Sequence, residues 1–361
     1  MADALERLTI VVPTFGRPDY VRRQVEFWDG SPVKLVVADG SPSGLLVDGT
    51  DFASNVTYFH TDGDFHSRML QLAEFVSTEF VAVLGDDDFF SPEGLRSCVE
   101  RLDSDPVLIG CVGRSIRFFF QDGRVLAEQR DPESSEFPEV VKTGLDRLNS
   151  TYHSGKIGAL FYGVYRTGPW KEVVRTAYSI RFKTGYIYDT IIRALITYRG
   201  PVGVEEVVTW FCSAENPPVR NAPGMDRTVG FVEWLSSEST AQEVQKCQEL
   251  IVRDLVSVGS DDTASLTAAV KYVFDELLRR YELKAEIRTR PIEKFRRMLV
   301  GNSPRFIKRL GKQVMPQRLR SVFDWTMMPM NELVENLKNR QVSISDVDVE
   351  RISRAILRSH G

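Results

Sequence analysis

The sequence predicts an α/β fold in which a mostly parallel sheet is flanked by helices, followed by a helical C-terminal region. Over the first hundred residues, short apolar runs alternate with stretches of helical character. Strands that alternate with helices need crossover connections, and these join parallel strands. After about residue 226 the pattern is almost wholly helical and is divided by prolines. We therefore expect two parts, an α/β domain at 1–225 and a helical region at 226–361.

Four apolar runs in the first part are typical of strands that are covered on both faces. They lie at 8–13, 34–39, 56–60 and 80–84. Helices are predicted between them and after the last, at about 19–28, from the mid-60s to about 76, and at 92–102. Farther along, the pattern predicts strands at 107–112, 116–120 and 157–165, a hairpin turn at 121–124 and a helix at 188–198.

The composition is that of a globular, soluble protein. Of the 361 residues, 42% are hydrophobic and 27% are charged, which excludes a disordered chain. The four cysteines (Cys98, Cys111, Cys212 and Cys247) are far apart and lack metal-ligand spacing, so we expect a reducing compartment. The first residues carry acids rather than an apolar signal, and no run reaches the roughly 18 apolar residues that span a bilayer. These features predict a cytoplasmic protein.

The charge is distributed unevenly. Residues 279–320 hold fourteen Lys and Arg against three Glu, a net charge of +11, so the rest of the chain carries −15. The segments 291–300 and 304–310 mix cations with bulky apolar residues, which is typical of helices that lie on an anionic membrane surface. A helical bundle with solvated basic faces explains the same pattern. Nucleic acid or another acidic partner is the least favoured of the three interpretations.

Acidic side chains follow two of the predicted strands. Asp39 ends the second strand, and Asp86, Asp87 and Asp88 come directly after the fourth. Open parallel sheets bind ligands at the carboxyl ends of their strands. Adjacent carboxylates repel one another unless a cation compensates them, and Mg²⁺ or Mn²⁺ suits carboxylates together with phosphate oxygens. A solvated turn that caps the next helix is the structural alternative for the three aspartates.

Three motifs resemble family 2 glycosyltransferases with the GT-A fold. Leu8 to Pro18 resembles the family's first strand and turn, and Val36-Val-Ala-Asp-Gly-Ser41 resembles its second strand. Val83 to Leu95 is similar to its metal-binding Asp-x-Asp strand end and the start of the next helix. The resemblance covers about residues 8–200. It implies a catalytic domain at 1–225 that transfers a sugar, with inversion, from a nucleotide-diphosphate sugar to an acceptor hydroxyl.

The resemblance also implies a set of site residues. The expected contacts to the donor are Pro13, Thr14, Phe15, Gly16, Asp39, Arg68, Asp86 and Asp87. Asp86 and Asp88 would hold Mn²⁺ or Mg²⁺, or Asp87 and Asp88 would share that role. The sequence departs from the family at Ala38 and at Gly85, where the family places aspartates. For Arg68, a solvated position on a helix is the alternative to a contact with the diphosphate.

Inverting transfer needs a general base, and the resemblance implies Asp189. Asp189 lies at the start of a predicted helix, where an aspartate also serves as a capping residue. His153 lies in a predicted loop, and Trp210 and Phe211 are expected in the core, although an aromatic ring can also stack on a sugar. The family's late histidine ligand is missing here, and Glu215 or Asn216 would replace it.

Two other functions stay open. A glycosyltransferase-like binding protein without catalysis would explain Ala38, Gly85 and the missing histidine. A nucleotidyltransferase shares the sheet and the acidic site, but it carries a Gly-rich basic loop where this chain has Thr14-Phe-Gly-Arg-Pro18. The expected partners are a nucleotide-sugar donor, first of all a UDP-sugar, and a saccharide, lipid-linked or other hydroxyl acceptor. Contact with a membrane surface is a further expectation, and nucleic acid is not an expected partner.

Overall fold

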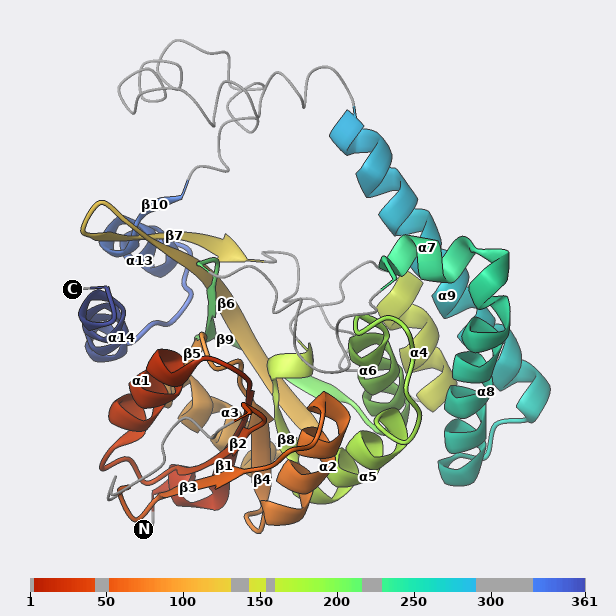
Figure 1. Ribbon diagram of the computed structural model, residues 1–361, viewed down its shortest axis with the longest axis horizontal. Coiled ribbons are helices and arrows are strands. Elements are labelled where there is room, and N and C mark those ends of the chain that lie inside the picture. Colours follow the sequence, from red (N-terminus) through yellow and green to blue (C-terminus); the bar gives the residue numbers. More distant parts are fainter. Residues whose placement is uncertain are drawn as a thin grey trace.

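The computed structural model describes residues 3–42, 52–130, 143–153, 160–215, 229–289 and 327–360. Within these ranges the strands form one mixed sheet (Figure 1) in the order β10-β7-β6-β8-β4-β1-β2-β3, with β9 beside β6 and β5. The strands are β1 (Leu8–Thr14), β2 (Lys34–Asp39), β3 (Val56–His60), β4 (Phe80–Val83), β5 (Phe89–Phe90), β6 (Gly110–Gln121), β7 (Arg124–Arg130), β8 (Val164–Arg166), β9 (Val202–Ser213) and β10 (Met328–Pro329).

Helices cover both faces of the sheet. They are α1 (Pro18–Trp28), α2 (Phe65–Phe75), α3 (Pro92–Ser104), α4 (Gly144–His153), α5 (Thr167–Ala177), α6 (Ile187–Arg199), α7 (Phe231–Ser236), α8 (Ala241–Val258), α9 (Thr263–Thr289), α13 (Met330–Lys338) and α14 (Asp346–Arg358). Short 3₁₀ helices lie at Ala4–Arg7, Leu160–Tyr162 and Glu238–Thr240. The predicted α/β class, with helices after residue 226, is confirmed.

The apolar strands serve two separate cores. In β1, Ile10 and Val12 pack into the core that includes α1, α3, α13 and α14, whereas Val11 packs into the core of α2, α5, α6, α8 and α9. Because successive strand residues point to opposite faces, a strand buried on both sides must be apolar throughout. β1 is parallel to β2 and β4, and β2 is parallel to β3. The first four strands therefore match the predicted parallel arrangement.

The second half of the sheet differs from the prediction in its details. Residues 110–121 form a single strand rather than two, and its pairing with β9 shifts in register around Arg114. The predicted hairpin is present, with positive φ at Asp122 and Gly123 as a tight turn requires. Of the predicted strand 157–165 only 164–165 is extended, as part of β8, because 160–162 is 3₁₀ and 157–159 lies outside the described residues. The helices α4 and α5 and the strand β9 were not predicted.

The residues after 327 return to the first part of the chain. Helix α14 lies beside α1 and β7, and Val207 of β9 bridges to Ser343 (Figure 1). The carboxylate of Asp348 accepts hydrogen bonds from the Ser91 hydroxyl at 2.5 Å and from the Glu93 amide at 2.9 Å, so it caps α3. The segment after residue 226 is thus divided between the two faces of the sheet. The domain boundary at 225 stays a prediction, and 290–320 of the basic segment lies outside the described residues.

Candidate active site

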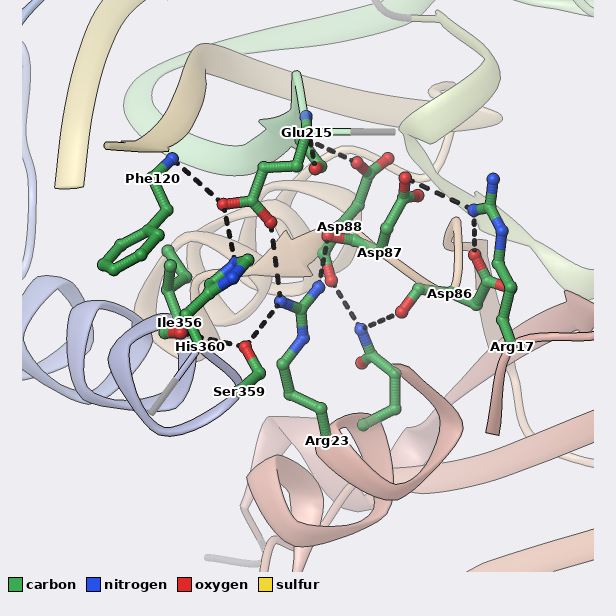
Figure 2. Close-up of polar contacts among 12 residues, drawn as sticks. Arg17, Arg23, Asp86, Asp87, Asp88, Phe120, Glu215, Ile356, Ser359 and His360 are labelled. Atoms are coloured by element: carbon green, nitrogen blue, oxygen red, sulfur yellow. Dashed lines mark hydrogen bonds and ion pairs between the residues drawn. The ribbon is translucent and has the colours of Figure 1, made fainter. Parts of the chain in front are cut away.

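The loop that carries Asp86, Asp87 and Asp88 joins β4 to β5 at the carboxyl end of the parallel strands. Side chains of α1 hold its backbone (Figure 2). Gln24 donates to the carbonyls of Asp86 at 3.1 Å and Asp88 at 2.5 Å, and Arg23 donates to the carbonyl of Asp87 at 2.7 Å. The three aspartates therefore do not form a freely solvated turn. Asp86 and Asp88 are buried, with 6% and 5% of their surface exposed.

Asp86 is compensated by a cation of the protein itself. Its carboxylate accepts from the Thr14 hydroxyl at 2.7 Å and from Arg17 Nη1 at 2.8 Å, and the same Arg17 nitrogen lies 3.4 Å from Asp87 Oδ2. Burial raises the pKa of Asp86, and the neighbouring Arg17 opposes that rise. The turn between β1 and α1 thus contributes both a hydroxyl and a guanidinium to the loop.

Among the described residues, the hydrogen-bond donors to the Asp88 carboxylate are neutral groups. The Trp210 indole N–H donates to Oδ2 at 3.0 Å, and the Ser213 amide donates to Oδ1 at 2.7 Å. Burial raises the pKa of Asp88 to about 7, the charge of Asp87 adds to that rise, and the charge of Arg130 opposes it. Arg130 does not pair directly with the carboxylate as Arg17 does with Asp86, so Asp88 is a buried carboxyl group whose charge is compensated only in part.

The residues present fit a divalent cation at Asp88 better than at Asp86. A cation near Asp88 would add to the partial compensation that Arg130 gives, whereas Arg17 pairs directly with Asp86. In the described part of the chain, no group of three His, Cys, Asp or Glu residues could hold a metal. Mg²⁺-type sites commonly use one or two carboxylates and complete their shell with water and substrate phosphates, so a single well-placed aspartate is compatible with such an ion.

The predicted donor residues gather around the end of β2. The carboxylate of Asp39 accepts from Ser41 N and Oγ, at 2.9 and 2.5 Å, and from the Tyr58 hydroxyl at 2.6 Å. The Ser41 hydroxyl in turn accepts from the amide of Gly16 at 2.7 Å. Gly16 has a φ of +68°, a conformation in which a residue with a side chain is strained. The turn after β1 is therefore joined directly to the end of β2.

Arg68 is buried, so the interpretation of it as a solvated helix residue is wrong. Only 3% of its surface is exposed, and its guanidinium lies 5.7 Å from the centre of the Phe15 ring. Nη1 donates to the carbonyl of Gly63 at 2.9 Å, and Nε has no hydrogen-bond partner among the described residues. A β-carbon at Gly40 would lie 1.8 Å from Nη1, so the glycine makes room for the arginine. Burial lowers the pKa of Arg68, while Asp39 opposes that shift.

Asp189 lies in the first turn of α6 and is not its capping residue, which is Tyr186. Its Oδ2 pairs with Arg193 at 2.5 Å, and its Oδ1 is buried without a hydrogen-bond partner in the described ranges. Tyr162 connects this residue with the loop at 86–88. Its ring stacks on Trp210 at 3.8 Å, and burial raises the pKa of its hydroxyl, with Asp88 and Asp189 raising it further. Asp88 and Asp189 are therefore near the same partly buried tyrosine.

Several residues that shape the site were not predicted from the sequence. They are Arg17, Arg23, Gln24, Ser41, Tyr58, Tyr162, Arg193 and Ser213. Arg17 carried the clearest signal, since it follows the first strand in the turn that was expected to line the donor. Trp210 and Phe211 are core residues, as expected. The side chain of His153, like Asn216, lies outside the described residues.

Known proteins resemble this chain in sequence over its first half and in structure over most of its length. Residues 9–167 match the model of the family described as glycosyl transferase family 2. Among solved structures, S. aureus TarS 1-349 is 14% identical with a TM-score of 0.48, over 97% of this chain and 90% of that chain. The same TarS segment in complex with UDP-GlcNAc is 14% identical with a TM-score of 0.49, over the same shares. No curated protein matches the sequence.

Proposed function

Residues 9–167 belong to glycosyl transferase family 2, and from this premise we propose that the protein transfers a sugar from a nucleotide-diphosphate sugar to an acceptor hydroxyl. The observation that carries the proposal is the pair of carboxylates around Tyr162. The charge of Asp88 is offset only in part, by Arg130, and Oδ1 of Asp189 has no hydrogen-bond partner among the described residues. Asp88 suits a cation–diphosphate complex, and Asp189 suits an acceptor hydroxyl that must lose its proton.

In the proposed reaction, the acceptor oxygen attacks the anomeric carbon and the bond from that carbon to the diphosphate breaks. The bonding electrons leave with the diphosphate, and the hydroxyl proton passes to Asp189. Arg193 holds Oδ2 of Asp189 at 2.5 Å, so the carboxylate that accepts the proton is kept in one orientation. Attack opposite to the leaving group inverts the configuration at the anomeric carbon.

The donor is held by the turn after β1 and the end of β2. Asp39, fixed by Ser41 and Tyr58, is the proposed contact to the nucleoside. Arg68 and Arg17 are the nearby cations for the diphosphate, and both are oriented by protein contacts before the donor arrives. A divalent ion at Asp88, when bound, would stabilise the charge that develops on the leaving diphosphate.

A panel of donors tests the proposal. Unfolding is followed with UDP-, GDP-, CMP- and dTDP-sugars, with and without Mn²⁺, for the wild type and Asp88→Ala. A ligand at a hundred times its Kd stabilises a protein by about 2.7 kcal/mol. We expect one nucleotide class, a UDP-sugar first, to stabilise the wild type in a Mn²⁺-dependent way and to lose this effect in Asp88→Ala. If no donor stabilises the wild type, the proposal is wrong.

The role of Asp189 needs a separate variant. Asp189→Asn should keep the stabilisation by the donor but lose transfer by about 10²- to 10⁴-fold, since only the proton acceptor is removed. A binding protein without catalysis would show donor binding and no transfer in the wild type. A nucleotidyltransferase would release pyrophosphate from a nucleoside triphosphate.

The place of action is also a proposal. Within the described residues no helix is both long and apolar enough to cross a membrane. We propose cytoplasmic action, with contact between the basic segment 279–320 and anionic lipid. Co-sedimentation with vesicles that contain or lack an anionic lipid tests this contact. Binding that is equal for both vesicle types would contradict it.

A further inference from the structure

The residues just after α14 are connected through Arg23 and Glu215 with the loop that carries the three aspartates, although more than 270 positions separate them (Figure 2). His360 stacks on the Phe120 ring with 4.3 Å between the ring centres and an angle of 8° between the planes. Its Nε2 lies 3.1 Å from Oε1 of Glu215, just beyond the end of β9. The residue before it, Ser359, accepts from Arg23 Nη1 at 3.3 Å.

Glu215 connects His360 with the strand end that holds Asp88. Its side chain is 5% exposed, and its Oε1 also accepts from the Phe120 amide at 3.0 Å. The Glu215 amide donates to the Ser213 hydroxyl at 3.2 Å, and the Ser213 amide donates to Asp88 Oδ1 at 2.7 Å. The backbone at 213–215 is thus attached to Asp88 through an amide and to α14 through a carboxylate.

Arg23 provides a second connection from α14 to the loop. Its guanidinium donates to the carbonyl of Asp87 at 2.7 Å, and it lies 4.0 Å from Glu215 Oε2. The side chain is 4% exposed, and the rings of Tyr20 and Phe89 lie 4.6 and 4.7 Å away. A buried guanidinium needs partners in fixed positions, because unmade hydrogen bonds are costly away from water. Ser359 and Glu215 are two of those partners.

We propose that Ser359 and His360 are positioning residues for the Asp86–Asp88 loop. His360 fixes Glu215, which fixes the strand end that donates to Asp88, and Ser359 helps to fix the Arg23 guanidinium that holds the carbonyl of Asp87. Neither residue touches Asp88 directly, so their effect on it is indirect. The consequence for sugar transfer rests on the proposed function, but the positioning itself does not.

Hydrogen exchange of backbone amides, measured on the full chain without any ligand, tests this. In His360→Ala we expect the amides at 86–89 and 213–215 to exchange about tenfold faster, as the loss of one hydrogen bond predicts for a local opening. The amides of β2, which do not contact α14, should exchange at the wild-type rate. Unchanged exchange at 86–89, or equal acceleration across the whole sheet, would overturn the proposal.

Two further variants separate the hydrogen bond from the ring stack. His360→Gln places an amide N–H near the position of Nε2 and should restore slow exchange, whereas His360→Phe keeps the stack without a donor and should behave like His360→Ala. Arg354→Ala is the matched control, because Arg354 pairs with Glu350 within α14 at the surface. If His360→Phe exchanges like the wild type, the connection through Glu215 is excluded. Failure of the donor panel would leave these results standing, so the two proposals fail separately.

Discussion

Asp86 and Asp88 lie two residues apart in one loop and are both buried, yet different kinds of groups donate to their carboxylates. On the flank toward α1, Arg17 and Thr14 bind Asp86. On the flank toward β9, an indole and a backbone amide bind Asp88, and burial raises its pKa to about 7. Arg17 pairs directly with Asp86, whereas the charge of Arg130 only partly offsets the burial of Asp88.

The difference shows that an Asp-x-Asp spacing does not by itself make two equivalent ligands. Whether a carboxylate can serve as a metal ligand depends on its nearest hydrogen-bond donor. A guanidinium removes most of the need for a metal, whereas a neutral N–H does not. The following predictions test whether Asp86 and Asp88 differ in their need for a metal ion.

The largest expected effect is the loss of transfer in Asp88→Asn, by about 10²- to 10³-fold, since the charge that would hold the ion disappears. The free energy of unfolding without metal should fall by no more than about 1 kcal/mol, because one hydrogen bond is lost while a buried charge is removed. Steady-state transfer and urea unfolding measure the two effects. Asp86→Asn is the matched change on the other flank, and an equal loss of transfer there would show that the flanks do not differ.

Arg17→Met should destabilise the metal-free protein by about 3 kcal/mol at neutral to mildly alkaline pH, because Asp86 loses its partner while it stays buried. Excess Mn²⁺ should restore much of this stability, since Asp86 would then be free to bind the ion. Urea unfolding with Mn²⁺ and with a chelator measures both. If Mn²⁺ restores nothing, Asp86 does not bind metal even without Arg17.

The stability of the metal-free protein should depend on pH through Asp88. Its pKa is about 7 in the folded state and near the ordinary 3.8 in the unfolded state. Between these values the folded state binds more protons, so the free energy of unfolding falls as pH rises, by at most about 1.4 kcal/mol per pH unit. The stability that protonated Asp88 contributes is complete below the unfolded-state pKa of 3.8 and is lost above about pH 7. The free energy of unfolding, measured across this pH range, should fall less steeply with pH in Asp88→Asn than in the wild type. An equally steep fall would exclude Asp88 as its source.

The smallest effect is expected at the turn that presents Arg17. Gly16→Ala should destabilise the protein by about 1 kcal/mol, because alanine is strained at a φ of +68° although no atom obstructs its β-carbon. Gly168→Ala, at a glycine without positive φ and with open space around it, is the control. Equal stability of both variants would mean that the turn adjusts.

The sequence was most informative where a local pattern determines the structure. The strands β2 and β3 begin and end where the apolar runs predicted, although only β2 is buried on both faces and β3 is partly exposed. The residues Gly113, Arg114 and Ser115 interrupt the apolar pattern of β6, and we therefore predicted two strands where the pairing only shifts in register. The acidic end of β4 was visible for a similar reason, because three aspartates follow a buried strand.

The partners of those aspartates were not predictable in the same way. Trp210 and Ser213 reach Asp88 from more than 120 positions away, and His360 reaches Glu215 from 145. No periodicity or motif encodes such pairings, because they depend on how separate elements pack. A tryptophan in an apolar strand has the same appearance in the sequence whether its N–H meets a carbonyl or a functional carboxylate.

The cap that Asp348 places on α3 has a consequence for how the chain folds as it is made. Ser91 caps the helix locally, through the amide of Gly94, and this contact forms as soon as the helix does. Asp348 lies 257 positions later, so a ribosome working at about 5–20 residues per second supplies it roughly 10–50 seconds afterwards. During that interval the amide of Glu93 lacks its carboxylate and the core beside α1 lacks α13 and α14. One face of the sheet is therefore covered only in part, by α1 and α3, until the last two helices are synthesised.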